Sequence, residues 1–465
     1  MTHTLDHGSA AGDLAGKSVA IIGLGASGMS AARLALAKGG DVYVSDLRTD
    51  PSTAARGADL EAAGARVELG THDLDRLESA GIVVVSPGIP PDAPVLRHLM
   101  HRGIRWITEP ELAVRFYKGP LIAVTGTNGK TTTTLLVAHL LESAGVQAAA
   151  GGNVGGGLAP AASELALLER EPAWYVLEMS SFQLAGIDQF RANIGVVTNL
   201  SPDHLDRYES VEAYYADKAR LFANAGRESI WVLPCGDEAV EALAGDVPGA
   251  RYRFGGSAED RSHAFVADGN LTLRLDGELE PLIAEVELPL LGRHNVLNAL
   301  AASLVARLAG ADAEGIAKGL RTARALPHRM EPVADRGGVL WVNDSKATNV
   351  SATLSALESL DRPVVALLGG KDKGEPFAQL APVLAGRARA VLTFGAAGPR
   401  IADELGDTVV AERLGDDFRV VLERAAQLAV PGDVVLLSPA CSSFDMFENY
   451  EHRGRLFTEI ARDVA

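Results

Sequence analysis

The stretch that decides the fold reads Val124-Thr125-Gly126-Thr127-Asn128-Gly129-Lys130-Thr131-Thr132-Thr133. It follows a short apolar run, Leu121 to Val124, and precedes a helix-like run from Leu135 to Leu141. A strand, a glycine loop, a Lys-Thr pair and a helix in this order are typical of a phosphate-binding loop. Backbone N–H groups and a helix N-terminus point at phosphate oxygens, the lysine adds a positive charge, and the hydroxyl reaches Mg²⁺. The stretch therefore predicts nucleotide binding, with a plain turn as the weaker alternative.

The glycine spacing differs from the common pattern Gly-x-x-x-x-Gly-Lys-[Ser/Thr]. Counting back from Gly129, that pattern places its first glycine at Val124, whereas the chain has it at Gly126. A Gly-Lys-Thr tripeptide alone would be a weak indication of a nucleotide site. The prediction therefore depends on the strand before the loop and the helix after it.

Composition limits the possible function classes. The 465 residues suggest two to four domains of roughly 100–200 residues each, and 47% of them are hydrophobic, enough for a sizeable core. The net charge of −17 argues against a nucleic-acid or anionic-membrane surface. Two cysteines are too few for a disulfide framework and indicate a reducing compartment. With no signal-peptide pattern and no long apolar run, we expect a cytoplasmic, monomeric globular enzyme that has no membrane partner.

A second glycine-rich turn lies near the N-terminus. After a loose tail to about residue 15, an apolar strand, Ser18 to Ile22, ends in Gly23-Leu24-Gly25-Ala26-Ser27-Gly28. A helix and a second strand follow, and the strand ends at Asp46. This matches the βαβ fingerprint of dinucleotide-binding folds. Because the glycine turn recognises a phosphate diester and the acid a hydroxyl or ring N–H, any nucleotide diphosphate fits and NAD is not required. A tight turn without a ligand is the alternative.

Further strands are predicted along the N-terminal region. Arg66 to Leu69 and Ile82 to Val85 are apolar runs, and the second ends in the stiff loop Ser86-Pro87-Gly88-Ile89-Pro90. Open α/β sheets bind ligands at the C-terminal ends of their strands, so this loop is a candidate ligand contact. A loop without function fits the same residues equally well.

Two strands beyond the phosphate loop end in candidate catalytic side chains. Trp174 to Leu177 leads to Glu178, and Ile194 to Asn199 leads to His204. A carboxylate directly after an apolar strand is where phosphate-loop proteins hold Mg²⁺. If these strands run parallel to the one before Gly126, Lys130, Thr131, Glu178 and His204 converge at one edge of the sheet. A purely structural histidine is the alternative for His204.

The remainder of the chain predicts antiparallel hairpins and a further α/β block. Residues 251 to 290 alternate apolar and polar positions and contain two Asp-Gly pairs, which indicates hairpins. Asn295, at the start of an Ala-rich helix, is either a helix cap or a ligand contact. Apolar strands then end in polar loops: Val339 to Val342 before 343–349, Val364 to Leu368 before 369–374, Val391 to Phe394 before Gly395, and Val434 to Leu437 before 438–445. We place the three α/β domains at 1–116, 117–325 and 326–465.

Six blocks of residues together resemble the Mur ligases of peptidoglycan synthesis and occur in that family's order. They are Gly126-Thr127-Asn128-Gly129-Lys130-Thr131-Thr132, Glu178-x-Ser180-Ser181-Phe182-Gln183-Leu184, Asn199-x-x-x-Asp203-His204-Leu205-Asp206, Gly292-x-His294-Asn295-x-x-Asn298-Ala299, Pro327-His328-Arg329 and Asn343-Asp344-Ser345-Lys346-Ala347-Thr348-Asn349. The N-terminal glycine turn with Asp46 and the final stretch from Ser438 to Asp445 most resemble the D-glutamate-adding branch, whose phosphate loop is similarly shortened.

The resemblance implies a three-domain α/β fold: a Rossmann-like N-terminal domain for a UDP substrate, a central P-loop domain for ATP, and a C-terminal Rossmann-like domain for the amino acid. It also implies the reaction. ATP phosphorylates the carboxylate of UDP-N-acetylmuramoyl-L-alanine, and the amine of D-glutamate attacks the acyl phosphate. The products are the amide, ADP and phosphate. Two Mg²⁺ ions and a carbamylated Lys218 are implied as well, although Lys218 on its own would be an exposed helix lysine.

The resemblance assigns roles to individual residues. Catalysis would use Lys130, Glu178, His204 and Lys218, with Mg²⁺ on Thr131, Glu178, His204 and carbamylated Lys218. ATP would contact Gly126, Thr127, Asn128, Gly129, Lys130, Thr131, Thr132, Asn295, Arg329, Asp344 (ribose) and Lys346 (phosphates). The UDP substrate would contact Leu24, Gly25, Ala26, Ser27, Asp46 (uracil), Arg48, Ser86, Asn153 and His204. D-Glutamate would contact Lys373, Thr348, Ser443 and Phe444, with Lys371 as an open alternative to Lys373.

Three other functions compete with this interpretation. An NAD-dependent oxidoreductase would explain the N-terminal turn but not Lys130 and Thr131. A folylpolyglutamate-synthase-like ligase, or another Mur-type ligase for a different amino acid, shares the central and C-terminal blocks; the former would not need the N-terminal UDP-type domain. A non-catalytic ATP-driven binding module would not need the complete set of candidate magnesium and substrate residues.

Overall fold

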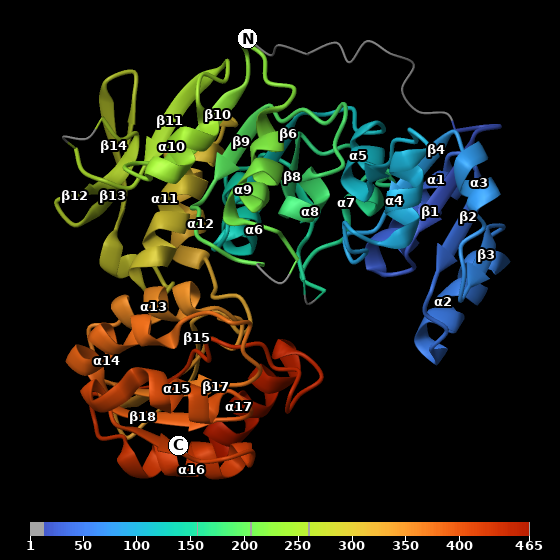
Figure 1. The fold of residues 1–465 in the computed structure, drawn as a ribbon. Helices are drawn as coiled ribbons and strands as arrows, with labels where there is room; N and C mark the ends of the chain where they lie inside the picture. The colour runs from blue at the N-terminus through green and yellow to red at the C-terminus, as the bar shows by residue number, and fades with distance from the viewer. Residues whose placement is uncertain (1–13, 156, 205–206, 259–260, 465) are drawn as a thin grey trace. The chain divides into compact units, whose positions relative to one another are not determined.

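The computed structural model describes residues 14–155, 157–204, 207–258 and 261–464. Its contacts divide the chain into two compact units, one of residues up to 264 together with 301–316, the other of 265–300 together with 317–465 (Figure 1). Most of the predicted N-terminal tail, and Leu205 and Asp206 of the His204 motif, lie outside the described residues. Within the described part of the chain, no helix is long and apolar enough to cross a bilayer.

The N-terminal sheet of the first unit is parallel throughout, in the order β3-β2-β1-β4-β5. Its central strand β1 is buried on both faces: one face packs with α1, and the other with α3 and α4. A strand buried on both sides needs a continuous apolar run, which is why the sequence predicted it correctly. The elements are β1 (Ser18–Ile22), α1 (Ala26–Ala37), β2 (Asp41–Asp46), α2 (Pro51–Ala62), β3 (Arg66–Leu69), α3 (Leu74–Ser79), β4 (Ile82–Val85), α4 (Pro94–His101), β5 (Ile107–Thr108) and α5 (Glu109–Val114).

A second parallel stretch carries the phosphate loop, in the order β11-β10-β9-β6-β8-β7. β6 lies between β8 and β9 and runs parallel to both. The loops after all three strands therefore leave the same edge of the sheet, as predicted. The elements are β6 (Leu121–Thr125), α6 (Lys130–Ser143), β7 (Ala148–Gly152), α7 (Ala162–Leu165), β8 (Trp174–Glu178), α8 (Ser181–Leu184), β9 (Ile194–Val197), α9 (Val211–Ala219), η1 (Arg220–Phe222), β10 (Ile230–Pro234), α10 (Glu238–Ala244) and β11 (Ala250–Phe254).

Two buried acids of α5 connect these sheets within the first unit. The Glu111 carboxylate accepts hydrogen bonds from the backbone N–H groups of Asp188, Gln189 and Phe190. Glu109 accepts one from Ser163 N at 2.5 Å, while its Oε2 has no partner among the described residues. Burial therefore raises the pKa of Glu109 to about 7. The carboxylate oxygens of Glu111 therefore have backbone donors, whereas one oxygen of Glu109 has no hydrogen-bond partner among the described residues.

The prediction of antiparallel hairpins over 251–290 is wrong for its first part. β11 pairs in parallel with β10, and its last residue pairs in parallel with the first residue of β12 (Ala264–Ala267). Alternating polarity shows which face of a strand is buried, but it does not give the direction of the partner strand. β13 (Asn270–Leu275) and β14 (Glu278–Ala284), in the second unit, do form an antiparallel hairpin. Asp276 and Gly277 connect them with positive φ angles of 52° and 85°, as a two-residue hairpin turn requires.

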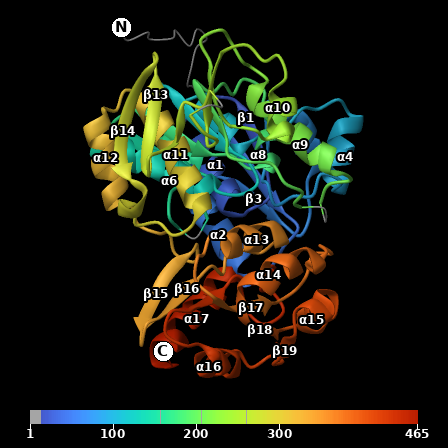
Figure 2. The same ribbon diagram turned by 90° about the vertical axis from the view of Figure 1, so that its left-hand side faces the viewer.

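The second unit contains a sheet in the order β15-β16-β20-β17-β18-β19, parallel except for β15 against β16. Alternate residues of β17 pack on α13, α14 and α15 on one face and on α16 and α17 on the other. In Figure 2, α13 and α14 lie above β17 and β18, and α16 lies below them.

The elements of this sheet and its helices are β15 (Glu331–Arg336), β16 (Val339–Asn343), α13 (Val350–Glu358), β17 (Val364–Gly369), η3 (Phe377–Leu380), α14 (Ala381–Arg387), β18 (Ala388–Phe394), α15 (Gly398–Leu405), η4 (Gly406–Thr408), β19 (Ala411–Arg413), α16 (Phe418–Leu428), β20 (Val434–Leu437) and α17 (Tyr450–Val464). Before them come η2 (Glu285–Glu287), α11 (Arg293–Leu308) and α12 (Ala313–Thr322), and the last two have residues in both units.

Candidate active site

The phosphate loop turns at Gly126, immediately after β6. Gly126 has φ 135°, and a Cβ on it would lie 2.1 Å from Thr198 Oγ1, so a glycine is required there. Gly129 has φ 81° and precedes Lys130, the first residue of α6. Val124 is a fully buried strand residue paired with Glu178 and Val196. Val124, the position at which the common pattern has its first glycine, is thus still part of β6. The loop between β6 and α6 is short for this reason.

The strand next to β6 holds the loop in place. Asn199 O accepts from Thr127 N at 2.9 Å, and its side chain exchanges two 3.0 Å hydrogen bonds with the backbone N–H and C=O of Asn128. Thr198 Oγ1 adds a 2.6 Å hydrogen bond to Asn128 O. Backbone groups of the loop are therefore oriented before any phosphate binds. The role of Thr198 and Asn199 was missed from the sequence, although two polar residues directly after an apolar strand were the available signal.

Lys218 lies beneath the loop instead of in solvent. Its side chain is 1% exposed, and its Nζ donates a 2.6 Å hydrogen bond to Gly126 O. The Tyr214 ring lies 4.6 Å from Nζ. Burial, followed by the charge of Lys130, lowers the pKa of Lys218 well below its usual value. The alternative of an exposed helix lysine is wrong here.

Glu178 ends β8 with one carboxylate oxygen bonded and one not. Asn153 donates from its backbone N–H to Glu178 O at 2.9 Å and from its side chain to Oε1 at 3.1 Å. Glu178 is 2% exposed, and Oε2 has no hydrogen-bond partner among the described residues. A buried, unpaired carboxylate oxygen suits a hard cation such as Mg²⁺. The described residues contain no cluster of three or more His, Cys, Asp or Glu side chains, so these ligands alone do not form a closed metal cage.

His204 borders an aromatic cluster on the same edge. It has φ 56°, and its ring contacts the rings of Phe182 (5.2 Å between centroids) and Tyr214 (6.0 Å) edge-on. The Arg207 guanidinium lies 4.3 Å above the Phe182 ring and donates to Ile89 O at 3.1 Å. The cluster thereby connects the His204 loop to the loop that follows β4.

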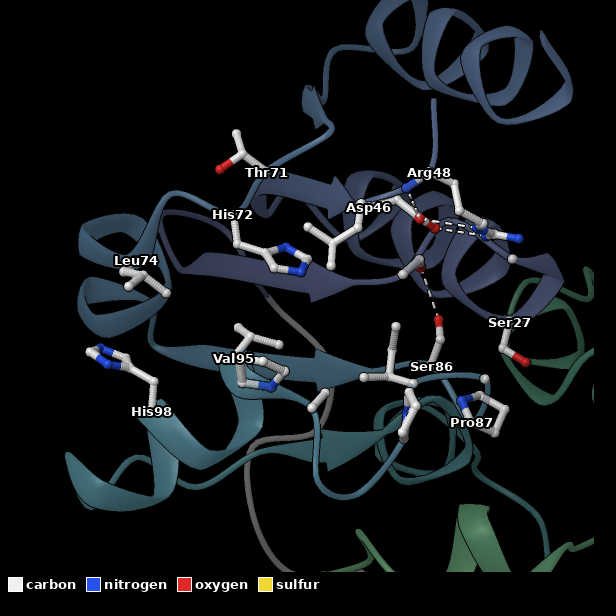
Figure 3. A pocket seen from close by; sticks show the side chains of 18 of the residues that line it. Ser27, Asp46, Arg48, Thr71, His72, Leu74, Ser86, Pro87, Val95 and His98 are labelled. Atoms are coloured by element: carbon white, nitrogen blue, oxygen red, sulfur yellow. Dashed lines mark hydrogen bonds and ion pairs between the residues drawn. The ribbon is translucent and has the colours of Figure 1, made fainter. Parts of the chain in front are cut away.

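A cavity of about 800 Å³ lies at the C-terminal edge of the N-terminal sheet (Figure 3). Most predicted contacts for the UDP substrate line it: Gly25, Ala26, Ser27, Asp46, Arg48 and Ser86. Leu24 is not a lining residue, but its backbone N–H donates to Asp46 Oδ2 at 2.7 Å. Ser86 Oγ donates to Gly23 O at 2.9 Å and joins the first glycine turn to the loop after β4.

Asp46 is already engaged by its neighbours. Besides Leu24 N, it accepts hydrogen bonds from Arg48 N (2.8 Å), Nε (3.0 Å) and NH2 (2.7 Å). Burial alone would raise the pKa of Asp46, but the Arg48 and Leu24 donors outweigh burial and lower that pKa to about 2. Asp46 is therefore an anion that holds both the glycine turn and Arg48.

In the second unit, the predicted ribose contact Asp344 lies between two segments. Met330 N donates to its Oδ1 at 3.1 Å, and Ser438 Oγ donates to its Oδ2 at 2.9 Å. Burial raises the pKa of Asp344 to about 7, although these donors and the nearby charge of Arg329 oppose the rise. Asn295, the third residue of α11, donates to Leu291 O and accepts from the Asn298 side chain, and neither contact is a helix-capping hydrogen bond to a backbone N–H.

The predicted D-glutamate residues occur on strand-end loops of the second unit. Lys371 exchanges two backbone hydrogen bonds with Ser442, next to Ser443. Phe444 is 69% exposed, a high value for an aromatic ring. Lys346 Nζ lies 3.9 Å from the Tyr450 ring, a contact that the sequence did not indicate.

Arg453 of α17 ties these loops together. It is fully buried and donates to Ser345 Oγ (2.9 Å), Ser345 O (2.8 Å) and Cys441 O (3.1 Å), with longer hydrogen bonds of 3.4 Å to Gly369 O and Ser442 O. One guanidinium therefore connects the loops after β16, β17 and β20. Nothing in the sequence separated Arg453 from other helix arginines.

Comparison with protein families and curated proteins identifies the chain. Three family models match successive stretches: a Mur ligase MurD-like N-terminal domain at 17–108, a Mur ligase middle domain at 124–306, and a Mur ligase glutamate ligase domain at 328–441. The UDP-N-acetylmuramoylalanine-D-glutamate ligase of Acidobacterium capsulatum is 42% identical over 452 residues, 96% of each chain. The chain belongs to the Mur ligase family. The ligases of the same name from Koribacter versatilis (41% identity; 97% of this chain, 99% of that one) and Anaeromyxobacter dehalogenans (42%; 98% and 100%) are similar over nearly the full length.

Solved structures agree on the Mur ligase fold. The pseudomurein peptide ligase type C of Methanothermus fervidus matches with a TM-score of 0.61 at 20% identity, and a UDP-N-acetylmuramate-alanine ligase of Thermotoga maritima with 0.59 at 21%. Both comparisons cover 97% of this chain and the whole of the other. The predicted three-domain α/β fold is confirmed, whereas the individual boundaries and site residues stay predictions.

The Mur ligase fold brings some predicted residues into contact. In the first unit, Lys218 contacts the phosphate loop, and Asn153 contacts Glu178. In the second, the charge of Arg329 acts to lower the pKa of Asp344, and Lys346 N donates to His328 O at 3.0 Å.

Proposed function

We propose that this chain is an ATP-dependent ligase that joins D-glutamate to UDP-N-acetylmuramoyl-L-alanine in peptidoglycan precursor synthesis. Identities of 37–42% over nearly the whole chain to ligases of that name carry the proposal. The shortened phosphate loop, held from below by Lys218, supports ATP as the phosphoryl donor. We propose that the ligase acts in the cytoplasm as a monomer, with domains at 1–116, 117–325 and 326–465.

The chemistry explains why such a site needs a phosphate loop. A carboxylate does not accept an amine until an oxygen becomes a better leaving group, and transfer of the γ-phosphoryl group provides one. Donor and acceptor are both anions, so positive charge must lie between them. Lys130, whose Nζ donates to Thr127 O at 2.7 Å inside the loop, supplies part of that charge. The backbone N–H groups at the start of α6 bind the phosphate oxygens.

We propose that Thr131 and Glu178 hold one Mg²⁺ ion and that His204 and carbamylated Lys218 hold a second. When bound, the ions supply the positive charge that Lys130 alone does not. The unpaired Oε2 of Glu178 supports the first site. The lowered pKa of Lys218 supports the modification, because a neutral amine adds to CO₂, forming an N–C bond and releasing one proton. The resulting carbamate is an oxygen ligand of the kind Mg²⁺ prefers.

The amino-acid side of the reaction belongs to the second unit. Lys373 or Lys371 offers a cation, and Thr348 and Ser443 offer hydroxyl donors, to the two carboxylates of D-glutamate. We propose that Asp344 and Arg329, with Lys346 and Asn295, contact ATP from this unit. In the N-terminal domain, the cavity lined by Ser27, Arg48 and Ser86 has the size of a nucleotide site and supports binding of the UDP moiety.

Phosphate release measured with ATP, UDP-N-acetylmuramoyl-L-alanine and D-glutamate tests the proposal. We expect release only when all three are present, with the amide confirmed by mass spectrometry. L-Glutamate, glycine and meso-diaminopimelate in place of D-glutamate are the controls. Turnover with another amino acid but not with D-glutamate would favour a Mur-type ligase of different specificity. Stimulation by a folate substrate would favour the folylpolyglutamate-synthase-like alternative.

A further inference from the structure

The loop after β17 carries both candidate lysines for the amino acid, Lys371 and Lys373, with Asp372 between them. D-Glutamate has two carboxylates, so an acid beside the lysine that binds it is unfavourable. Such an acid would repel the substrate and would compete with it for the ammonium group. The Asp372 carboxylate instead pairs with Arg400 of α15, at 2.8 Å, and not with either lysine.

The two halves of this loop are anchored to different segments. Lys371 exchanges two backbone hydrogen bonds with Ser442, and Ser442 Oγ also donates to Lys371 O at 2.8 Å. Lys373 lies in a turn that Gly374 N closes by donating to Asp372 Oδ1 at 2.9 Å. The position of Lys371 therefore depends on the loop after β20, whereas that of Lys373 depends on Asp372.

Arg400 holds the second half of the loop through three acceptors. Besides Asp372, its guanidinium donates to Glu404 Oε1 at 2.7 Å and to the backbone oxygen of Glu375 at 3.0 Å. The guanidinium also lies 5.1 Å from the centroid of the Phe377 ring. Phe377 N donates to Glu404 Oε2 at 2.7 Å, which ties the end of the loop to the same acid.

A single ion pair of this exposure would contribute little. The side chains of Arg400 and Asp372 are 38% and 34% exposed, and solvent screens pairs of this kind. A guanidinium that binds two carboxylates and a carbonyl oxygen is different, because its nitrogens lie in one rigid plane and fix the three acceptors relative to one another. We therefore expect Arg400 to orient the loop more than it stabilises the fold.

The same network reaches the N-terminus of α13. Glu375 Oε2 accepts a 2.9 Å hydrogen bond from Val350 N, two residues beyond the candidate D-glutamate contact Thr348. Arg400 binds the backbone oxygen of the same Glu375. One arginine therefore connects the turn that carries Lys373 with the segment that carries Thr348, although it belongs to neither.

We propose that Arg400 is a positioning residue for the amino-acid substrate. It withdraws the Asp372 carboxylate from the site and holds the turn, so that the Lys373 ammonium is left to bind a substrate carboxylate. The inference rests on the proposed function, because it takes an amino acid with two carboxylates as the substrate. It also assigns this role to Lys373 in preference to Lys371, whose backbone is fixed independently of Arg400.

The test measures phosphate release at varied concentrations of D-glutamate, ATP and UDP-N-acetylmuramoyl-L-alanine. Arg400→Met is expected to raise the KM for D-glutamate about tenfold, the effect of losing one hydrogen bond between charged groups. The kcat and the other two KM values should stay close to those of the wild type. Arg413→Met is the matched control, because Arg413 pairs with Asp403 on the same helix as Arg400. This control should keep the wild-type KM for D-glutamate.

Removing the charge of Asp372 separates a positioning role from a structural one. Adding Asp372→Asn to Arg400→Met should restore most of the affinity for D-glutamate, because asparagine keeps the acceptor for Gly374 N but does not repel the substrate. Lost packing of α15 would not be repaired by this change. In a Lys373→Met background, Arg400→Met should have little further effect, whereas in a Lys371→Met background its effect should persist.

Arg400→Lys provides the same comparison with Asp372→Asn if Arg400→Met does not fold, because a single ammonium nitrogen cannot serve all three acceptors in one plane. The inference would be overturned by an unchanged KM for D-glutamate, by an equal rise in Arg413→Met, or by a parallel rise in all three KM values. It would also be overturned if Asp372→Asn gave no recovery, or if the effect persisted in full without Lys373.

The same measurements distinguish the inference from the proposed function. If the wild-type chain uses D-glutamate with a KM that is independent of Arg400, the inference fails and the proposed function stands. If D-glutamate does not stimulate phosphate release in the wild-type chain, the proposed function fails and the inference fails with it.

Discussion

Lys218 Nζ and the carbonyl oxygen of Gly126 lie 2.6 Å apart, so a buried helix lysine is fastened to the residue at which the phosphate loop turns. A neutral amine can donate this hydrogen bond, and a carbamate formed on the same nitrogen keeps one N–H to donate it. Modification therefore need not break the contact. The two carbamate oxygens would instead add negative charge directly under the loop, where a metal ion is expected.

Replacing Lys218 by alanine should remove most of the ligase activity, on the order of 100-fold. The cause is loss of the proposed metal ligand together with the support of Gly126. Added short carboxylic acids should restore part of the activity by supplying oxygen atoms in the space left behind. Phosphate release with and without acetate measures both effects. Lys118→Ala, a change at a lysine side chain 74% exposed, is the control and should leave activity and rescue unaffected.

Gly126→Ala should destabilise the protein and weaken ATP binding. The new Cβ meets Thr198 Oγ1 at 2.1 Å, and φ 135° is unfavourable for alanine, which together cost about 3 kcal/mol. Gly145→Ala separates the two causes, because Gly145 also has a positive φ of 76° but no atom lies within 4 Å of its Cβ. Thermal melting and the KM for ATP measure the difference. Equal destabilisation in the two variants would show that the contact with Thr198 is unimportant.

Glu109→Gln should make the stability of the first unit less dependent on pH. The pKa of Glu109 is raised to about 7 in the folded chain, against 4.5 in an unfolded one. Its protonated form is thus favoured by folding. This contribution of protonated Glu109 to the free energy of unfolding is fully present below pH 4.5 and is lost as the pH rises through 7. Above that pH, the buried anion costs about 3 kcal/mol of stability. The glutamine variant should melt at a higher temperature than wild type at pH 8 and at a similar one near pH 4.5.

Glu111→Gln is the control for Glu109→Gln, and its expected effect on the melting temperature at pH 8 has the opposite sign. Its carboxylate accepts three backbone N–H groups and also contacts Arg115, so a neutral amide leaves donors poorly satisfied. This variant should melt at a lower temperature than wild type at pH 8. A stabilising effect of Glu111→Gln, or a destabilising effect of Glu109→Gln at pH 8, would contradict the described arrangement of the two acids.

Arg453→Met should raise the KM for D-glutamate at least about fivefold and lower the melting temperature. The guanidinium is the shared donor to three loops, and methionine fills its volume but leaves buried carbonyl oxygens unpaired. The KM for the UDP substrate should change little, because its proposed site lies in the other unit. Arg462→Met changes an exposed arginine on the same helix and serves as the control. Parallel increases in both KM values would indicate general unfolding instead.

The sequence predicted the strands better than the contacts between side chains. β1, β17 and β20 are continuous apolar runs buried on both faces, so hydrophobicity alone located them. The hairpin prediction failed at β11, because alternation gives the exposure of a strand but not the direction of its neighbour. Turn chemistry was more reliable: the Asp-Gly pair at 276–277 forms the expected turn.

The candidate site was predicted mainly through the resemblance to a family. Without it, Lys218 would have been assigned to solvent, since a single lysine in a weakly amphipathic helix carries no sign of its burial. Burial depends on where α9 packs, which is a tertiary property. The same holds for Arg453, which donates to Ser345, 108 residues away along the chain. Local sequence cannot encode such pairs, although it correctly marked the loops on which several of them lie.

The filled carboxylate of Asp46 has a consequence for inhibitor design. A compound that reaches this cavity with an amidine or ammonium group aimed at Asp46 would compete with Arg48 for oxygens that are already bonded. Its gain in binding would be largely cancelled by the donors that it displaces. An uncharged compound that fills the cavity without contacting the Asp46 oxygens avoids that exchange. Medicinal chemistry on this pocket should therefore begin from uncharged compounds.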